Sequence, residues 1–175
     1  MNIVLDGTTL NINDICAVID GKPTISIAES AMEKMKLSRS IVERIISNKE
    51  IVYGINTGFG ALAEVEIDEE ELSQLQYNLI RSHACGTGEL MTVGLTRAMM
   101  LIRANSLAKG HSGVQPRLVE GLVDFLNLGR GACVPEIGSL GASGDLAPLS
   151  HMALPLIGEG FCYGEDGEEI PRREA

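Results

Sequence analysis

The sequence predicts a mainly α-helical protein with small β-hairpins. Two stretches, residues 28–48 and 69–83, place apolar side chains at spacings of three and four, the period of one helix face. Runs that favour strands are short, and two of them surround Asp-Gly pairs, a strong signal for tight hairpins. With 45% hydrophobic residues, the 175-residue chain is long enough for one domain with a real core. It has three Phe, three Tyr and no Trp, so aliphatic side chains, Met and Ala must pack that core.

The first 60 residues are expected to alternate short strands with helices. Residues 3–5 and 8–10 flank Asp6-Gly7 and predict a hairpin. A short helix is expected after Asn13, and an amphipathic surface helix from about residue 28 to 48. Residues 51–60 are interpreted as a strand-like entry into a Gly-rich loop.

A capping box marks the next helix. Asp68 and Glu71 stand three residues apart, and Glu69 and Glu70 beside them favour the positive end of a helix dipole. This pattern predicts a helix from about Glu69 to His83.

The second half of the chain is expected to hold the centre of the fold. Residues 92–109 are apolar on most faces, which is typical of a buried helix in a domain or an oligomer. On this helix we expect three paired core polar groups, Arg97, Arg103 and Asn105. The remaining expected elements are a helix from Pro116 through Leu126, a loop over 127–144 with five glycines, a helix over 146–157 bent near Pro155, and a hairpin over 163–171 around Asp166-Gly167.

Composition excludes several classes of protein. A net charge of −10 and a pI near 4.7 argue against nucleic acid and anionic membranes as partners. The sequence has neither a basic leader followed by an apolar core nor an apolar run long enough to span a membrane, so we expect no export. Four scattered cysteines without CxxC spacing indicate a reduced, cytoplasmic chain. His111, His151 and the cysteines match no zinc pattern, so these residues are interpreted as structural and no metal is expected.

The most informative stretch is the glycine-dense run from Gly138 to Leu149. It places Ala142-Ser143-Gly144 immediately before a predicted helix start. Glycine reaches positive φ without a Cβ clash, so the backbone can bend sharply here. Asp145 is expected to cap the following helix and to orient the loop, and Pro148 falls within the first turn, where a missing N–H does little harm.

A tightly bent Ala-Ser-Gly can turn its own backbone into a prosthetic group. The amide nitrogen of Gly144 attacks the carbonyl carbon of Ala142, and two waters are lost: one from the closing ring, and one from Ser143, whose side chain is left as an exocyclic methylidene. The product is the electrophile 4-methylidene-imidazol-5-one (MIO). A helix N-terminus suits it, because the positive end of the dipole stabilises negative charge. The alternative for Ser143 is an ordinary turn serine.

Three blocks of the chain resemble the aromatic amino acid ammonia-lyases, and most closely those that act on histidine. They are residues 53–60 (YGINTGFG), 78–88 (NLIRSHACGTG) and 138–149 (GSLGASGDLAPL), in family order. The resemblance implies the N-terminal region and first core helices of the lyase fold, with residues 1–90 as an N-terminal helical region carrying a β-hairpin and the active-site Tyr loop. Residues 91–175 would begin the central helical domain with the MIO-forming loop. It further implies a homotetramer whose active sites combine several subunits, an amino acid substrate, and no nucleotide.

The resemblance gives Tyr53 the role of the base that removes the substrate β-proton. A phenol normally titrates near 10 and needs activation by nearby positive dipoles or hydrogen bonds. Glycines at positions 54, 58 and 60 allow the loop to close over the substrate, which is the supporting role expected of Gly60. The alternative for Tyr53 is a half-buried packing residue.

His83 is the expected substrate-binding residue. Leu72, Leu75 or Gln76, and Leu79 share one helix face with it, so His83 lies at the C-terminal end of the inward face, where the dipole favours its protonated form. In the family, the dipeptide matching Ser82-His83 lies where the substrate ring binds. Ser-His accompanies histidine, whereas phenylalanine lyases carry Phe-Leu and tyrosine lyases His-Leu. The alternative for His83 is a satisfied core histidine.

The resemblance therefore implies conversion of L-histidine to trans-urocanate and ammonia, a reaction of histidine degradation. Alternatives are a lyase for another aromatic amino acid, a 2,3-aminomutase, and a catalytically silent fragment that only associates with a complementary chain. The family's later active-site elements, an Asn-Gly loop, a second Tyr with an Arg, and a Glu, have no counterpart here. We therefore expect a fragment or a split-gene subunit.

Overall fold

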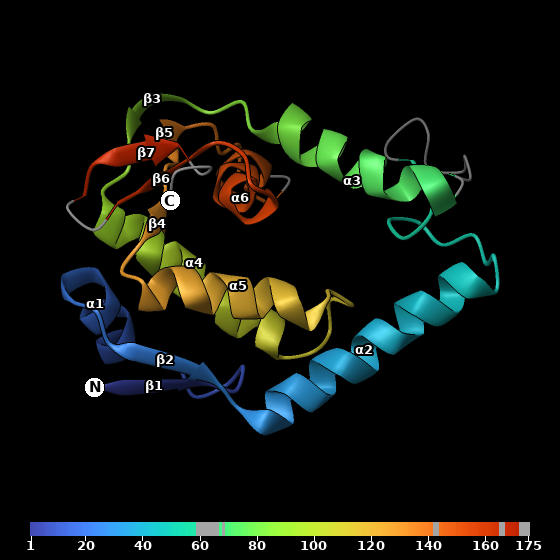
Figure 1. Cartoon of the computed structure of the whole chain (residues 1–175), viewed down its shortest axis with the longest axis horizontal. Coiled ribbons are helices and arrows are strands. Elements are labelled where there is room, and N and C mark those ends of the chain that lie inside the picture. Colours follow the sequence, from blue (N-terminus) through green and yellow to red (C-terminus); the bar gives the residue numbers. More distant parts are fainter. Residues whose placement is uncertain (59–66, 68, 142–143, 165–166, 172–175) are drawn as a thin grey trace.

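Two central helices, α4 (Val93–Ala108) and α5 (Pro116–Asn127), organise the computed structural model, which describes residues 1–58, 67, 69–141, 144–164 and 167–171. On one side of them lie α1 (Ile12–Asp20) and a two-stranded sheet, and on the other lie α6 (Leu146–Ala153) and two further small sheets (Figure 1). Helices α2 (Glu29–Ser47) and α3 (Glu69–His83) extend away as two arms joined at their far ends by the segment around residues 51–58 (Figure 1). The mainly helical fold class is confirmed.

The first predicted hairpin is wrong. Strand β1 (Asn2–Leu5) pairs in parallel with β2 (Thr24–Ile27), with α1 as the crossover. The Asp6 carboxylate accepts hydrogen bonds from the amides of Thr8 (2.7 Å) and Thr9 (2.8 Å), and these bonds lower the pKa of Asp6 to about 2. This side-chain turn leads the chain onward into α1 and does not fold it back onto β1.

The predicted helices are confirmed; α3 has the predicted bounds, and the ends of the others differ from the prediction by at most four residues. Asn11 caps α1 through a capping box with Asp14, and Thr92 caps α4 by accepting from the Leu95 amide. Pro116 occupies the first turn of α5. The capping box expected at the start of α3 cannot be followed, because Asp68 lies outside the described residues.

Helix α4 is largely buried, as expected, and Arg97 and Asn105 are paired there, whereas Arg103 is exposed, contrary to the expectation of a core polar group. Arg97 is 5% exposed; its Nη2 donates to Gly21 O at 2.6 Å, and burial lowers the pKa of this guanidinium. Asn105 accepts from the Gly7 amide at 3.0 Å. These two bonds fasten the N-terminal segment to the central helix.

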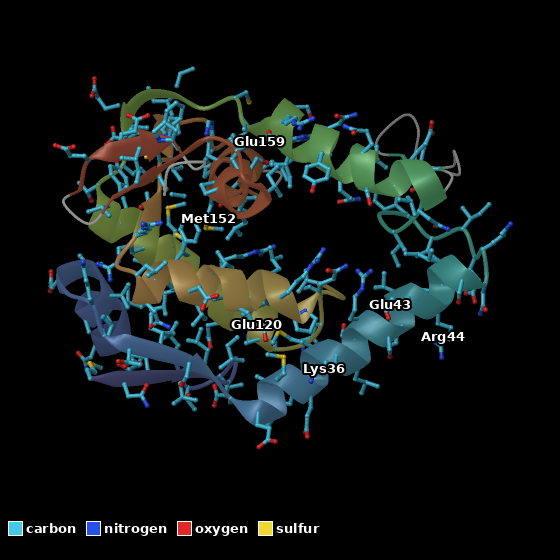
Figure 2. All side chains as sticks on the ribbon, in the orientation of Figure 1. Lys36, Glu43, Arg44, Glu120, Met152 and Glu159 are labelled. Carbon is cyan, nitrogen blue, oxygen red and sulfur yellow. The ribbon has the colours of Figure 1, made fainter. Side chains whose placement is uncertain are left out.

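One hydrophobic core joins the N-terminal strands to α4 and α5. Aliphatic and Met side chains dominate it and Phe125 is its aromatic member, which confirms the expected packing. Met152 points from α6 toward α5 (Figure 2). The most buried members of this core include Leu5, Val18, Met35, Met100, Leu101, Leu122 and Leu126. The side chains of Lys36, Glu43 and Arg44 on α2 are exposed (Figure 2).

The C-terminal part builds two small antiparallel sheets. Strand β3 (Thr87–Leu90) pairs with β5 (Pro135–Ile137), and β6 (Phe161–Tyr163) lies between β4 (Gly131–Ala132) and β7 (Glu169–Pro171). The β6–β7 pairing confirms the second predicted hairpin, although Asp166 of its turn lies outside the described residues. Helix α6 changes to a 3₁₀ turn (Leu154–Ile157), where a bend was predicted.

The cysteines are all free thiols. Cys16 and Cys85 are exposed, whereas Cys133 and Cys162 are buried. Burial raises the pKa of the Cys133 thiol to about 12, so this side chain remains a protonated apolar group. No helix in the described part of the chain is long and apolar enough to cross a membrane.

Candidate active site

The loop before α6 is bent on both sides of the Ala-Ser-Gly tripeptide. Ala142 and Ser143 lie outside the described residues, but Gly141 (φ +75°), Gly144 (φ +87°) and Asp145 (φ +55°) all adopt positive φ. A Cβ at Gly144 would meet nothing within 4 Å, so glycine is needed there for its φ and not for lack of space. Positive φ before and after Ala142-Ser143 fits the bent backbone that closure of an MIO ring requires.

Asp145 does not cap α6 with its side chain, contrary to the prediction. Its backbone is left-handed, and its carboxylate accepts a hydrogen bond from the Ser139 hydroxyl. The bond spans the loop and joins its two ends; the expected role of Asp145 in orienting the loop stays a prediction. A positive φ in a non-glycine residue costs free energy, and such strain is characteristic of functional sites. Pro148 lies in the first turn of α6, as predicted, and is buried.

His83 ends α3 with one ring nitrogen already engaged. Nδ1 lies 2.8 Å from Leu79 O, and because a carbonyl only accepts, Nδ1 must carry the proton. The Ser82 hydroxyl donates to the same carbonyl at 2.9 Å and lies 3.0 Å from Nδ1. Among the described residues Nε2 has no hydrogen-bond partner. The expected position at the end of the inward face is confirmed: His83 is half-buried, like Leu72, Leu75 and Leu79, whereas Gln76 is exposed.

The structure brings this end of α3 against the start of the glycine-dense loop. The Gly86 amide donates to His151 Nε2 of α6 at 3.0 Å. A Cβ on Gly138 would lie 3.0 Å from Gly86 Cα, so the two main chains touch. Arg81 adds an ion pair with Glu159, which faces α3 (Figure 2). The pair lowers the pKa of Glu159 and raises that of Arg81.

Tyr53 lies elsewhere in the chain. Its segment is found between the end of α2 and the start of α3 (Figure 1), and the Tyr53 side chain is 62% exposed. A helix of 15 residues rises about 20 Å, so α3 separates this segment from His83. Residues 53–55 form a turn where a strand-like entry was predicted, with a single bridge residue at Thr57, and Gly60 lies outside the described residues.

The turn at Tyr53 is held by two buried residues that the sequence interpretation did not single out. Asn56 accepts from the Val52 amide (3.0 Å) and donates to Glu50 O (2.8 Å), and it is 4% exposed. Thr57 is 1% exposed and accepts from the Gly54 amide. An Asn among turn residues is a known signal for such side-chain-to-backbone bonding and would have found Asn56.

A groove of about 460 Å³ opens beside this turn. Gly54 and Ile55 form part of its wall together with residues of α2, α3 and the loop before α5. The described residues contain no group of three His, Cys, Asp or Glu side chains placed to hold a metal ion.

The arrangement of helices around α4 and α5 defines the class, because it is the fold of solved ammonia-lyases and aminomutases. A histidine ammonia-lyase from Trypanosoma cruzi matches 99% of this chain with a TM-score of 0.91 and 35% identity, over 33% of its own length. A tyrosine aminomutase from Streptomyces globisporus matches 99% of this chain with a TM-score of 0.91 and 38% identity, over 32% of its own length.

The chain belongs to the aromatic amino acid lyase family, whose sequence model matches residues 10–175. Among curated relatives, a histidine ammonia-lyase from Staphylococcus saprophyticus is 50% identical over 173 residues, which is 99% of this chain and 34% of that protein. The chain thus spans about a third of the length of the relatives it matches. The resemblance stated from the three sequence blocks is confirmed.

Proposed function

We propose that this chain forms part of a longer or complemented enzyme that converts L-histidine to trans-urocanate and ammonia. The observation that carries the proposal is the hydrogen bonding of His83. Nδ1 is fixed by Leu79 O and Nε2 has no hydrogen-bond partner among the described residues, while Gly86, three residues further on, contacts Gly138 at the start of the glycine-dense loop. When the His83 ring is neutral, Nε2 accepts a hydrogen bond, which suits the N–H of a substrate imidazole.

The Ala142-Ser143-Gly144 sequence and the bent backbone on either side of it support MIO as the prosthetic group. When formed, MIO supplies an electrophile that makes departure of the substrate amine possible. The Ser139–Asp145 bond holds the two ends of the loop together, and the N-terminus of α6 presents its positive dipole end to the same place. Ser82 orients His83.

Tyr53 is proposed to take the β-proton of the substrate. Its exposure and its place beyond the far end of α3 support a site that another subunit completes, as in the tetrameric assembly implied by the family. The free cysteines support a reducing compartment, and we place the protein in the cytoplasm. Residues 91–175 are proposed to begin the central helical domain, with residues 1–90 as the region before it.

The similarity to a tyrosine aminomutase favours a second candidate. In that case the same residues serve a 2,3-aminomutase, or a lyase for another aromatic amino acid. The two reactions differ in product, because a lyase releases an unsaturated acid and ammonia whereas an aminomutase returns the amine to the β-carbon. Product analysis by NMR separates them.

The decisive experiment is Ser143→Ala in the full-length protein that carries this sequence. Intact mass should show the wild type lighter than its sequence mass by two water molecules, and the variant at its full sequence mass. Urocanate formation should fall by several orders of magnitude in the variant, because the removed group is covalent and central. Asp14→Asn, in α1 and away from the loop, is the matched control. Normal deamination by Ser143→Ala would remove the MIO proposal.

A further inference from the structure

Four residues from three segments meet where the end of α3 approaches the glycine-dense loop. We call Gly86, Gly138, Ala147 and His151 the glycine junction. A Cβ on Gly138 would lie 3.0 Å from Gly86 Cα and 3.2 Å from the Ala147 Cβ. A Cβ on Gly86 would lie 3.1 Å from His151 Nε2 and 3.2 Å from the Pro135 Cβ. The main chains at Gly86 and Gly138 are therefore in direct contact, and no side chain lies between them.

His151 supplies the directional bond of the junction. Its Nε2 accepts from the Gly86 amide, so Nε2 carries no proton and Nδ1 carries it. The imidazole is half-buried, and burial lowers its pKa, which favours this neutral ring. A buried amide without a partner is costly, so the bond fixes where Gly86 lies relative to α6.

The junction links the two segments that the proposed reaction needs. Gly86 follows His83 by three residues, and the turn between them is closed by bonds from Ala84 N to Ile80 O (3.0 Å) and from Cys85 N to His83 O (2.9 Å). On the other side, His151 lies on the helix that begins directly after Asp145. Movement at Gly86 is thus transmitted to Ser82-His83 through a short, hydrogen-bonded turn.

We propose that His151 is a positioning residue, whose bond to the Gly86 amide sets the distance between Ser82-His83 and the Gly138–Asp145 loop. The inference rests on the proposed function, since it concerns the geometry of that same site. His151 contacts no substrate in this scheme. It acts through Gly86, and its role requires an acceptor at Nε2 and not an imidazole as such.

The test uses His151→Phe and His151→Gln in the full-length protein. Phe fills space without accepting, whereas Gln places its Oε1 as many bonds from Cα as Nε2 of histidine and can accept from Gly86. His111→Phe, at an exposed histidine in the loop before α5, is the matched control. The measurements are kcat and KM with the amino acid that the wild type deaminates, intact mass, and hydrogen exchange of the Gly86 amide.

For His151→Phe we expect kcat to fall about tenfold or more with KM changed far less, because small displacements of reacting groups have large effects on rate. Its Gly86 amide should exchange faster, while its mass still shows loss of two waters. His151→Gln and His111→Phe should resemble the wild type. Wild-type kcat in His151→Phe would overturn the inference, as would a loss of ring closure in that variant, which would place His151 in ring formation.

Gly86→Ala tests the junction with His151 intact, should His151→Phe not fold. The added methyl presses on Nε2 and Pro135 and should lower kcat in the same way. Gly121→Ala is its matched control, because that Cβ would meet only Leu156 at an ordinary 3.6 Å. Unchanged kcat in Gly86→Ala would contradict the inference. A wild type without lyase or aminomutase activity would refute the proposed function instead, and the exchange of Gly86 in His151→Phe would still decide whether the bond forms.

Discussion

Asn56→Ala should open the turn that carries Tyr53. The Asn56 side chain makes two hydrogen bonds, at 3.0 Å from Val52 N and 2.8 Å to Glu50 O, while being 4% exposed. Each such bond contributes about 1 kcal/mol net, and a backbone group left without its partner costs about 1–3 kcal/mol. Water reaches part of this surface turn and offsets some of the loss. Asn56→Ala should therefore lower the free energy needed to open the turn by about 2–4 kcal/mol.

Amide hydrogen exchange measures this opening directly. The amides of Ile55 and Ile67 donate to Val52 O and Asn56 O, so neither bond uses the Asn56 side chain that is removed. Their exchange should accelerate about 30-fold or more, since 1.4 kcal/mol is about a factor of ten. Asn48→Ala removes a single exposed bond, from Asn48 Nδ2 to Glu50 Oε1 at 2.9 Å, and is the control. Acceleration below about threefold in Asn56→Ala would refute the reasoning.

The other predictions concern specificity, isolation of the chain and pH. His83→Leu should lower the ratio of kcat/KM for histidine over phenylalanine by about tenfold or more, because an unpaired imidazole costs a few kcal/mol; an unchanged ratio would make His83 a core histidine. The 175-residue chain alone should lack lyase activity and self-associate in sedimentation, since Leu95 (47%) and Ile102 (49%) leave one face of α4 exposed; a monomer that deaminates histidine would contradict this. Because burial lowers the pKa of His151, its stabilisation should be complete above about pH 6.5 and be lost as pH falls toward the lowered value. His151→Gln should accordingly flatten the decline of the urea midpoint between about pH 7 and 5, and an equally steep decline would count against it.

The sequence was sufficient to predict the elements whose signals are local. Apolar spacing placed α2 and α3, Pro116 marked the start of α5, and the Asp166-Gly167 pair placed the β6–β7 hairpin. The Asp6-Gly7 pair failed because the Asp6 carboxylate takes the Thr8 and Thr9 amides, and because β1 finds its partner beyond α1. A parallel pairing across a helix leaves no signal at the turn itself.

The sequence could propose residues for the candidate site but not the contacts between them. The motifs gave Ser82, His83 and Asp145 without showing what each one contacts. His151 was interpreted only as structural. Its bond to Gly86 could not be predicted, because it joins residues 65 positions apart and depends on the packing of α3 against α6. The separation of Tyr53 from His83, by contrast, follows from the bounds of α3, which the sequence predicted.

The main-chain contact between Gly86 and Gly138 has a consequence for how substrate preference can change. Spacing at this point is set by backbone atoms, which every amino acid shares. Side chains at positions 82 and 83 can therefore be exchanged without moving the loop that follows Gly138. In work to change substrate preference, residues 82 and 83 can be substituted while the backbone contact stays in place. Positions 86 and 138 should remain glycine in those variants.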